Sequence, residues 1–121
     1  MNHTNNIIAF SKELTWDDLP FKVRDYTKLC LLDLLGVAAS GAGTKLSNIA
    51  CGYAALDMSG TIPMIFDGRK ASVAGVAMAG GMTIDSLDGH DGYKPAKRHA
   101  VSGQFPAFNA VSQDKKSISA Q

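Results

Sequence analysis

The chain has 121 residues, a formal net charge of +1 and 45% hydrophobic residues, which is an ordinary balance for one modest globular domain. Its lysines and arginines are scattered, so the sequence does not predict a concentrated positive surface that would attract nucleic acid or anionic membranes. Its apolar runs are too short for a secretory signal or a membrane span, and we expect a soluble cytoplasmic protein.

The N-terminal segment predicts a short helix followed by a capped turn. Apolar contacts within residues 5–14 favour the helix. Thr15 is a candidate N-cap, because Asp17 and Asp18 follow it in the first turn, where a helix dipole favours negative charge. Pro20 then directs the chain into the next element.

Two further helices are predicted, over residues 21–39 and 46–58. The first is amphipathic at its start and apolar nearly all round over its second half. A helix of that kind is typically buried on several sides, so we expect Asp33 to have a partner inside the bundle. Cys30 and Cys51 lie in apolar, helix-like contexts, and we expect buried thiols rather than a disulfide or a metal pair.

The middle of the chain predicts one extended piece and a helix of small residues. Residues 61–66 are the best strand candidate, and Asp67-Gly68 follows as a turn. The predicted helix over 71–84 is rich in glycine and alanine, which lets neighbouring backbones approach closely. Glycine costs roughly 1 kcal/mol in a helix interior, and we expect close packing to offset that cost.

The last helix is predicted to start near Gly103 or Pro106, since proline suits a first turn. Residues 113–121 are polar and carry no apolar stripe, which indicates a loop. The fold class is therefore all-α, with one short extended segment near 61–70.

The segment from Ile84 to His99 is the densest in titratable groups. It holds three carboxylates, two imidazoles and two lysines, and Gly89, Gly92 and Pro95 break any helix through it. Like charges repel and buried charges lose hydration, so such clusters occur more often at sites of chemistry than in purely structural loops. No nucleophile elbow and no glycine-rich phosphate loop is present in the sequence.

Five further features follow one another along the chain. They are Trp16-Asp17-Asp18-Leu19-Pro20, Leu31-Leu32-Asp33-Leu34-Leu35-Gly36, the extended piece 65–72, the small-residue helix running into Leu87-Asp88 and His99, and Phe105-Pro106-Ala107. In this order they resemble the N-terminal part of the MmgE/PrpD family. The family includes 2-methylcitrate dehydratase, cis-aconitate decarboxylase and iminodisuccinate epimerase. Here the family loop is replaced by Leu87-Asp88-Gly89-His90-Asp91-Gly92-Tyr93, which resembles a branch with an Asp-Gly-His-Asp-Gly loop.

The resemblance implies a large all-helical domain and a smaller lid domain, usually in a dimer. Residues 1–121 correspond to a single partial helical domain, the opening portion of the larger one, with the lid domain absent. Family enzymes use further basic residues that come later in the chain. We therefore expect a truncated gene product or a fragment that is inactive in isolation.

The resemblance also implies the chemistry of the site. The expected reaction is a lyase reaction, dehydration or decarboxylation of a di- or tricarboxylic acid, through removal of a proton next to a carboxylate. Asp88 and His99 are the expected catalytic residues. The expected substrate-binding residues are His90, Asp91, Tyr93 and Lys97. No cofactor and no metal are expected, and the expected partners are the small carboxylate substrate and a second copy of the chain, through a homodimer or self-association of exposed helix faces.

Three alternatives stay open at this point. The substrate could be iminodisuccinate-like and the reaction an epimerisation. Asp85, Asp88, His90, Asp91 and His99 could instead hold a metal ion, although no helical histidine pair or cysteine pair fixes the geometry. The chain could also be a non-catalytic remnant or a helical assembly module, in which the charged side chains are simply solvated and Asp85 caps a helix.

Overall fold

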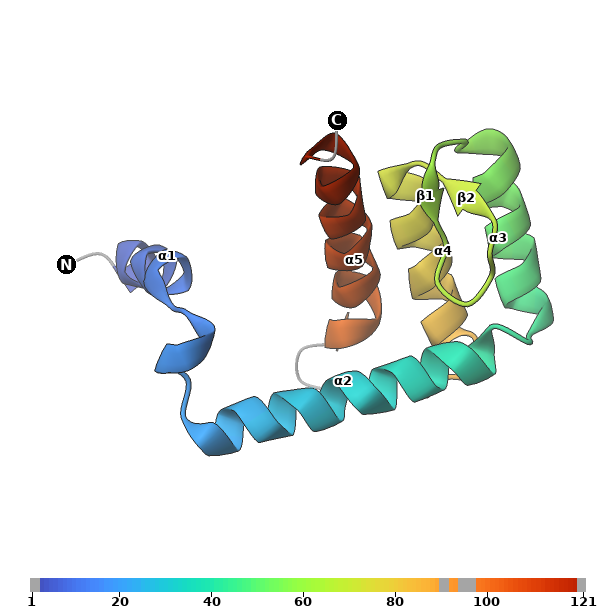
Figure 1. The fold of residues 1–121 in the computed structure, drawn as a ribbon. Coiled ribbons are helices and arrows are strands. Elements are labelled where there is room, and N and C mark those ends of the chain that lie inside the picture. The colour runs from blue at the N-terminus through green and yellow to red at the C-terminus, as the bar shows by residue number, and fades with distance from the viewer. Residues whose placement is uncertain (1–2, 90–91, 94–97, 120–121) are drawn as a thin grey trace. The chain divides into compact units, whose positions relative to one another are not determined.

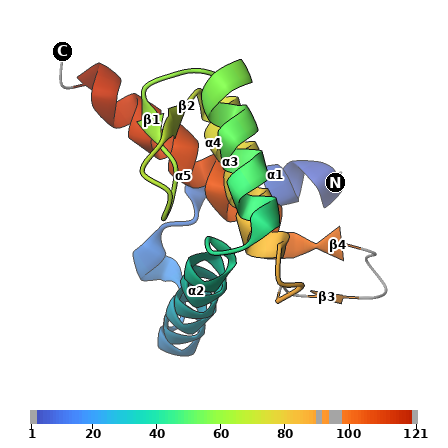
Figure 2. The same cartoon turned by 90° about the vertical axis from the view of Figure 1, so that its right-hand side faces the viewer.

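The computed structural model describes the backbone of residues 3–89, 92–93 and 98–119, and the side-chain surroundings of 6–89 and 103–115. The chain forms two compact units, Met1–Leu32 and Asp33–Gln121. The described elements (Figures 1 and 2) are α1 (His3–Glu13), the 3-10 turn η1 (Trp16–Asp18), α2 (Phe21–Gly41), α3 (Lys45–Asp57), β1 (Ile62–Pro63), β2 (Lys70–Ala71), α4 (Val73–Asp85), β3 (Gly92–Tyr93), β4 (Arg98–His99) and α5 (Ala100–Ser119). The predicted all-α class is confirmed, and the extended piece near 61–70 is the β1–β2 hairpin.

The first unit contains α1, the η1 turn and the beginning of α2. Thr15 is the N-cap residue of η1, as predicted, and Asp18 Oδ2 accepts from its backbone N–H at 2.9 Å, as in a capping box, and from its hydroxyl at 2.6 Å. The hydroxyl hydrogen bond, helped by the backbone one, holds the pKa of the Asp18 carboxyl below its ordinary value. Helix α2 then starts directly after Pro20, whose carbonyl accepts from Val23 N at 2.9 Å.

Helix α2 differs from its expected environment. Only one face, formed by Leu34, Ala38 and Gly41, is buried, and Asp33 is exposed rather than paired inside a bundle. The buried residues are spaced four and three apart, so they form a single stripe that one neighbouring layer covers. Among the described residues no single helix is long and apolar enough to cross a bilayer.

The second unit has its core between α3, α4, α5 and the β1–β2 hairpin (Figures 1 and 2). The buried cluster consists of Cys51, Ala54, Ile62, Met64, Ala71, Val76, Ala79 and Ala110. Helix α4 lies at the centre, and its small residues permit the close approach that the sequence predicts. A Cβ on Gly75 would lie 2.8 Å from Ala71 Cβ, and one on Gly80 would lie 2.7 Å from Pro106 Cβ.

The β1–β2 hairpin pairs Ile62 with Ala71, and Met64 N donates to Arg69 O at 2.8 Å. Its turn uses two residues in the left-handed region, Phe66 at φ 56° and Gly68 at φ 85°. Glycine adopts this region without steric cost, whereas a bulky residue such as Phe66 is strained there.

The C-terminal helix departs from the prediction at both ends. Helix α5 begins at Ala100, so Pro106 lies inside it and not in its first turn, and the helix continues to Ser119 through the polar segment predicted as a loop. Proline inside a helix loses one backbone hydrogen bond. Here Pro106 is buried against Gly80, which supplies a packing reason for its position. A second short ladder, β3–β4, lies just before α5.

Candidate functional site

The candidate site segment joins two antiparallel helices, α4 and α5. Gly80 meets Pro106 at their crossing, Ile84 and Phe105 pack in one cluster, and Val76 packs near Ala110 in the other. From this crossing α4 continues for five residues and α5 extends back for six, which is about 8 and 9 Å of helix. Both ends of the site segment therefore leave the helical layer at nearly the same level.

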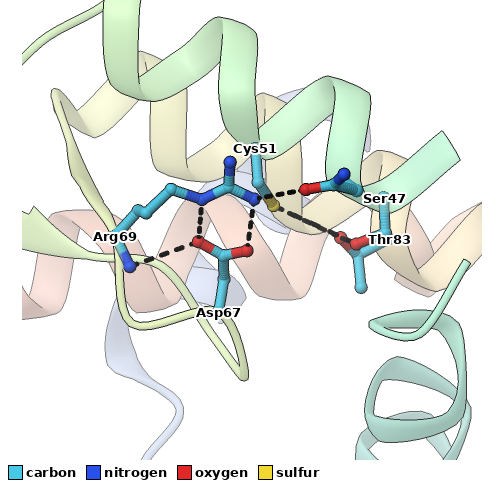
Figure 3. A network of polar contacts seen from close by, with 6 residues as sticks. Ser47, Cys51, Asp67, Arg69 and Thr83 are labelled. Carbon is cyan, nitrogen blue, oxygen red and sulfur yellow. Dashed lines mark hydrogen bonds and ion pairs between the residues drawn. The ribbon is translucent and has the colours of Figure 1, made fainter. Parts of the chain in front are cut away.

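The end of α4 that leads into the site is tied to α3 by a buried polar contact. Ser47 Oγ and Thr83 Oγ1 share a hydrogen bond of 2.7 Å, and Cys51 Sγ lies 3.9 Å from the same Thr83 hydroxyl (Figure 3). Burial, reinforced by the charge of Asp67, raises the pKa of the Cys51 thiol. The thiol is 1% exposed, so it is a packed structural group and not an accessible nucleophile.

The turn after α4 is held against the C-terminal end of α2. Ser86 Oγ donates to Thr83 O at 2.7 Å, and it also lies 3.3 Å from Gly41 O. A Cβ on Gly41 would fall inside the contact distance of the Thr83 carbonyl oxygen, and one on Gly89 would lie 3.2 Å from Val37 Cγ1. Because glycine has no Cβ, Gly41 and Gly89 allow the turn to pack directly against α2.

Asp88 lies in this turn, exposed, with a left-handed backbone at φ 54°. Its N–H donates to the carbonyl of Asp85, the last residue of α4, at 3.0 Å. Aspartate is among the few non-glycine residues that tolerate this region. The turn therefore presents an exposed Asp88 side chain from a backbone that is fixed on both sides, by α4 and by α2.

The β3–β4 ladder returns the chain toward the same region. Gly92 pairs with His99, and Tyr93 pairs with Arg98. The backbone of His99 is thereby placed across from a residue only four positions after Asp88. The side chains of Tyr93 and His99 are outside the described part of the structure, and His90, Asp91 and Lys97 lie outside the described residues altogether.

Sequence reasoning missed the residues that position this turn. Ser86, Thr83 and Gly41 do not carry chemistry by themselves, so a search for titratable side chains passes over them. The available signal was the pattern of small residues: Gly41 ends one helix, and Ser86 follows the end of the glycine-rich one. Such residues allow the backbone approach that the turn requires.

A second polar cluster lies at the turn of the β1–β2 hairpin (Figure 3). Arg69 Nε and Nη2 each donate to the Asp67 carboxylate at 2.6 Å, and Nη2 also reaches Asn48 Oδ1 of α3 at 3.2 Å. The Arg69 side-chain hydrogen bonds hold the pKa of Asp67 below its ordinary value. This cluster clamps the hairpin to α3, and none of the site residues expected from the sequence belongs to it.

Comparison with known proteins identifies one family. The profile of the MmgE/PrpD N-terminal domain matches residues 5–120, nearly the whole chain. No curated protein and no solved structure gives a significant match. The five-feature resemblance found in the sequence therefore has independent support over its full extent.

Proposed function

The chain belongs to the MmgE/PrpD family, and on that premise we propose that its α4–α5 segment serves a lyase reaction on di- or tricarboxylic acids. The reaction is dehydration or decarboxylation, begun by removal of a proton from the carbon beside a carboxylate. Asp88 takes this proton or orients the group that does, and His99 acts as the acid or anchors a substrate carboxylate. His90, Asp91, Tyr93 and Lys97 complete the binding surface.

The observation that carries the proposal is the register of α4 and α5. Because Gly80 and Pro106 fix the crossing, the turn bearing Asp88 and the strand bearing His99 emerge from the same end of the helix pair. A base and an acid that serve one substrate must approach it from neighbouring positions. This register supports such a pairing without a long excursion of the chain.

Epimerisation of an iminodisuccinate-like substrate begins with the same proton removal and differs in how the proton is returned. The choice between the two is therefore an outcome of assays with cis-aconitate, 2-methylcitrate and iminodisuccinate. We expect no turnover by these 121 residues alone, because the family reaction uses basic residues beyond this domain. Turnover by the chain would refute that expectation, and its product would name the reaction.

Binding tests the site separately from turnover. We expect cis-aconitate, titrated into the labelled chain, to shift the backbone amide NMR signals of the 85–99 segment. His99→Ala should weaken this binding, whereas Asp88→Asn should preserve or strengthen it, since it removes a negative charge beside an anionic ligand. Asp57→Asn on α3 is the matched control and should change little. Shifts confined to other segments, or insensitivity to His99→Ala, would favour a non-catalytic remnant or assembly module.

We further propose a cytoplasmic location and self-association through exposed helix faces. The support for self-association is the number of large apolar side chains that the described residues expose on α2, α3 and α5.

A further inference from the structure

The chain contains three Asp-Gly dipeptides, Asp67-Gly68, Asp88-Gly89 and Asp91-Gly92. Aspartate before glycine is prone to a spontaneous rearrangement, because no side chain on the glycine hinders attack of its main-chain nitrogen on the aspartate carboxyl carbon. Asp91 lies outside the described residues, so the described geometry concerns the first two dipeptides.

We propose that Asp88-Gly89 is a site of isoaspartate formation in the folded chain and that Asp67-Gly68 is protected from it. In the first step the main-chain nitrogen of Gly89 attacks Cγ of the neutral Asp88 carboxyl group. An N–Cγ bond forms, and one carboxyl oxygen leaves as water with the amide proton and the carboxyl proton. Water then opens the resulting succinimide ring. Opening at Cγ restores aspartate, whereas opening at the main-chain carbonyl leaves the chain linked through Cγ, and neither step needs an oxidant or a reductant.

The surroundings of Asp88-Gly89 permit this reaction. Both residues are exposed, so water reaches the carboxyl group and the succinimide. Gly89 lies outside any helix or strand, and no backbone hydrogen bond within the described part of the chain holds its N–H. The hydrogen bond from Asp88 N–H to the Asp85 carbonyl lies on the other side of the Asp88 Cα. Ring closure rotates the bonds that follow this Cα, so that hydrogen bond does not oppose it.

The carboxylate of Asp67 is held by three hydrogen bonds from one residue. Asp67 Oδ1 accepts from Arg69 N at 3.2 Å and from Arg69 Nε at 2.6 Å, and Oδ2 accepts from Nη2 at 2.6 Å (Figure 3). Ring closure would have to break these hydrogen bonds to bring Cγ to Gly68 N. The Arg69 side-chain hydrogen bonds also lower the pKa of Asp67, so the neutral carboxyl group that reacts is scarcer. The ion pair therefore protects this dipeptide.

The rearrangement would alter the candidate site. An isoaspartate adds one carbon to the main chain and shortens the group that bears the carboxylate. The added length falls beside Gly89, where a Cβ would already lie 3.2 Å from Val37 Cγ1 of α2. The turn would therefore lose its present fit against α2. The effect on catalysis rests on the proposed function, whereas the formation of isoaspartate does not.

The test is peptide mapping of the full chain after storage at physiological temperature and mildly acidic pH, with electron-transfer fragmentation to locate isoaspartate. An Asp91→Glu background removes the neighbouring Asp-Gly dipeptide. We expect isoaspartate to accumulate at position 88 at least several-fold faster than at position 67 while the chain is folded. In concentrated urea the two rates should become similar, because the dipeptides are identical and the fold no longer distinguishes them.

Variants test the cause of the difference. Arg69→Gln should raise the rate at position 67 in the folded chain and leave position 88 unchanged. Gly89→Ala should suppress the reaction at position 88, as should Asp88→Glu, which adds nothing beside Val37, and far-UV circular dichroism checks that each variant retains its helices. Equal rates at the two positions in the folded chain, or no isoaspartate at position 88, would overturn the proposal. An unchanged rate at position 67 in Arg69→Gln would overturn protection by the ion pair. These rates do not depend on cis-aconitate, so a failure of the proposed function would be seen separately in the binding titration.

Discussion

Gly41→Ala should destabilise the second unit although it adds only one methyl group. The new Cβ falls inside the contact distance of the Thr83 carbonyl oxygen and 2.8 Å from Ser86 Oγ. The carbonyl belongs to α4, so relief requires a helix to shift. Overpacking of this kind costs about 1–3 kcal/mol, against a helix-propensity gain of at most about 1 kcal/mol. We expect a net loss of about 1–2 kcal/mol in the free energy of unfolding.

Gly36→Ala is the matched control on the same helix. Nothing lies within 4 Å of the Cβ that it would add, so only the propensity term remains, and we expect a gain of about 0.5–1 kcal/mol. Urea unfolding followed by far-UV circular dichroism should separate the two variants by about 1 M in midpoint with similar slopes. If Gly41→Ala were stabilised as much as Gly36→Ala, the close crossing of α2 and α4 would be refuted.

Three further predictions concern the polar groups of the second unit. Ser47→Ala and Thr83→Val should each lower the free energy of unfolding, measured by urea titration, by about 1–3 kcal/mol, because each leaves one buried hydroxyl unpaired. The double variant should lose less than the sum of the two single losses. Additive losses would mean that the hydroxyls do not interact. Arg69 lowers the pKa of Asp67, so the contribution of Asp67 to the free energy of unfolding is complete above the unfolded-state pKa and is lost as the pH falls through the folded-state pKa. Arg69→Gln should reduce this loss of stability at acid pH. An unchanged dependence of stability on pH would contradict the ion pair. Burial raises the pKa of the Cys51 thiol, so the free energy of unfolding should fall as the pH rises above the ordinary pKa range of a thiol. In a Cys30→Ser background, iodoacetamide should label Cys51 only when the chain unfolds. Rapid labelling of the folded chain would show that the thiol is accessible.

The helices of the second unit were predictable where local signals and packing agree. Ser72 and Thr44 cap α4 and α3 by accepting from Gly75 N and Ser47 N, and the small residues of α4 are buried where the sequence indicates close packing. The hairpin was predictable from its strand and from the Asp67-Gly68 turn.

Predictions from local sequence failed where the conformation of a residue depends on packing against another element. The missing N–H of Pro106 indicates a helix start, yet α5 begins six residues earlier. The proline ring is accommodated inside the helix, where it fills the space beside Gly80. The apolar half of α2 indicates burial on several sides, but a helix face is buried only where a neighbour exists, and sequence periodicity does not say how many neighbours there are.

The candidate site was predictable in its chemistry but not in its geometry. The density of carboxylates and imidazoles marks the segment after α4, and the conformation of Asp88 follows from its turn. The support from Ser86, Thr83 and Gly41 depends on contacts between α2 and α4 that lie 45 positions apart in the case of Ser86 and Gly41. Side-chain type alone carries no information on such pairings.

The contact between Gly80 and Pro106 limits where the length of this chain can vary. One residue inserted into α4 between Gly80 and Asp85 would turn everything beyond it by about 100° and advance it by about 1.5 Å. The turn that carries Asp88 would then lose its contacts with Gly41 and Val37 of α2. We therefore expect insertions to be absent from α4 between Gly80 and Asp85 and from α5 between Ala100 and Pro106.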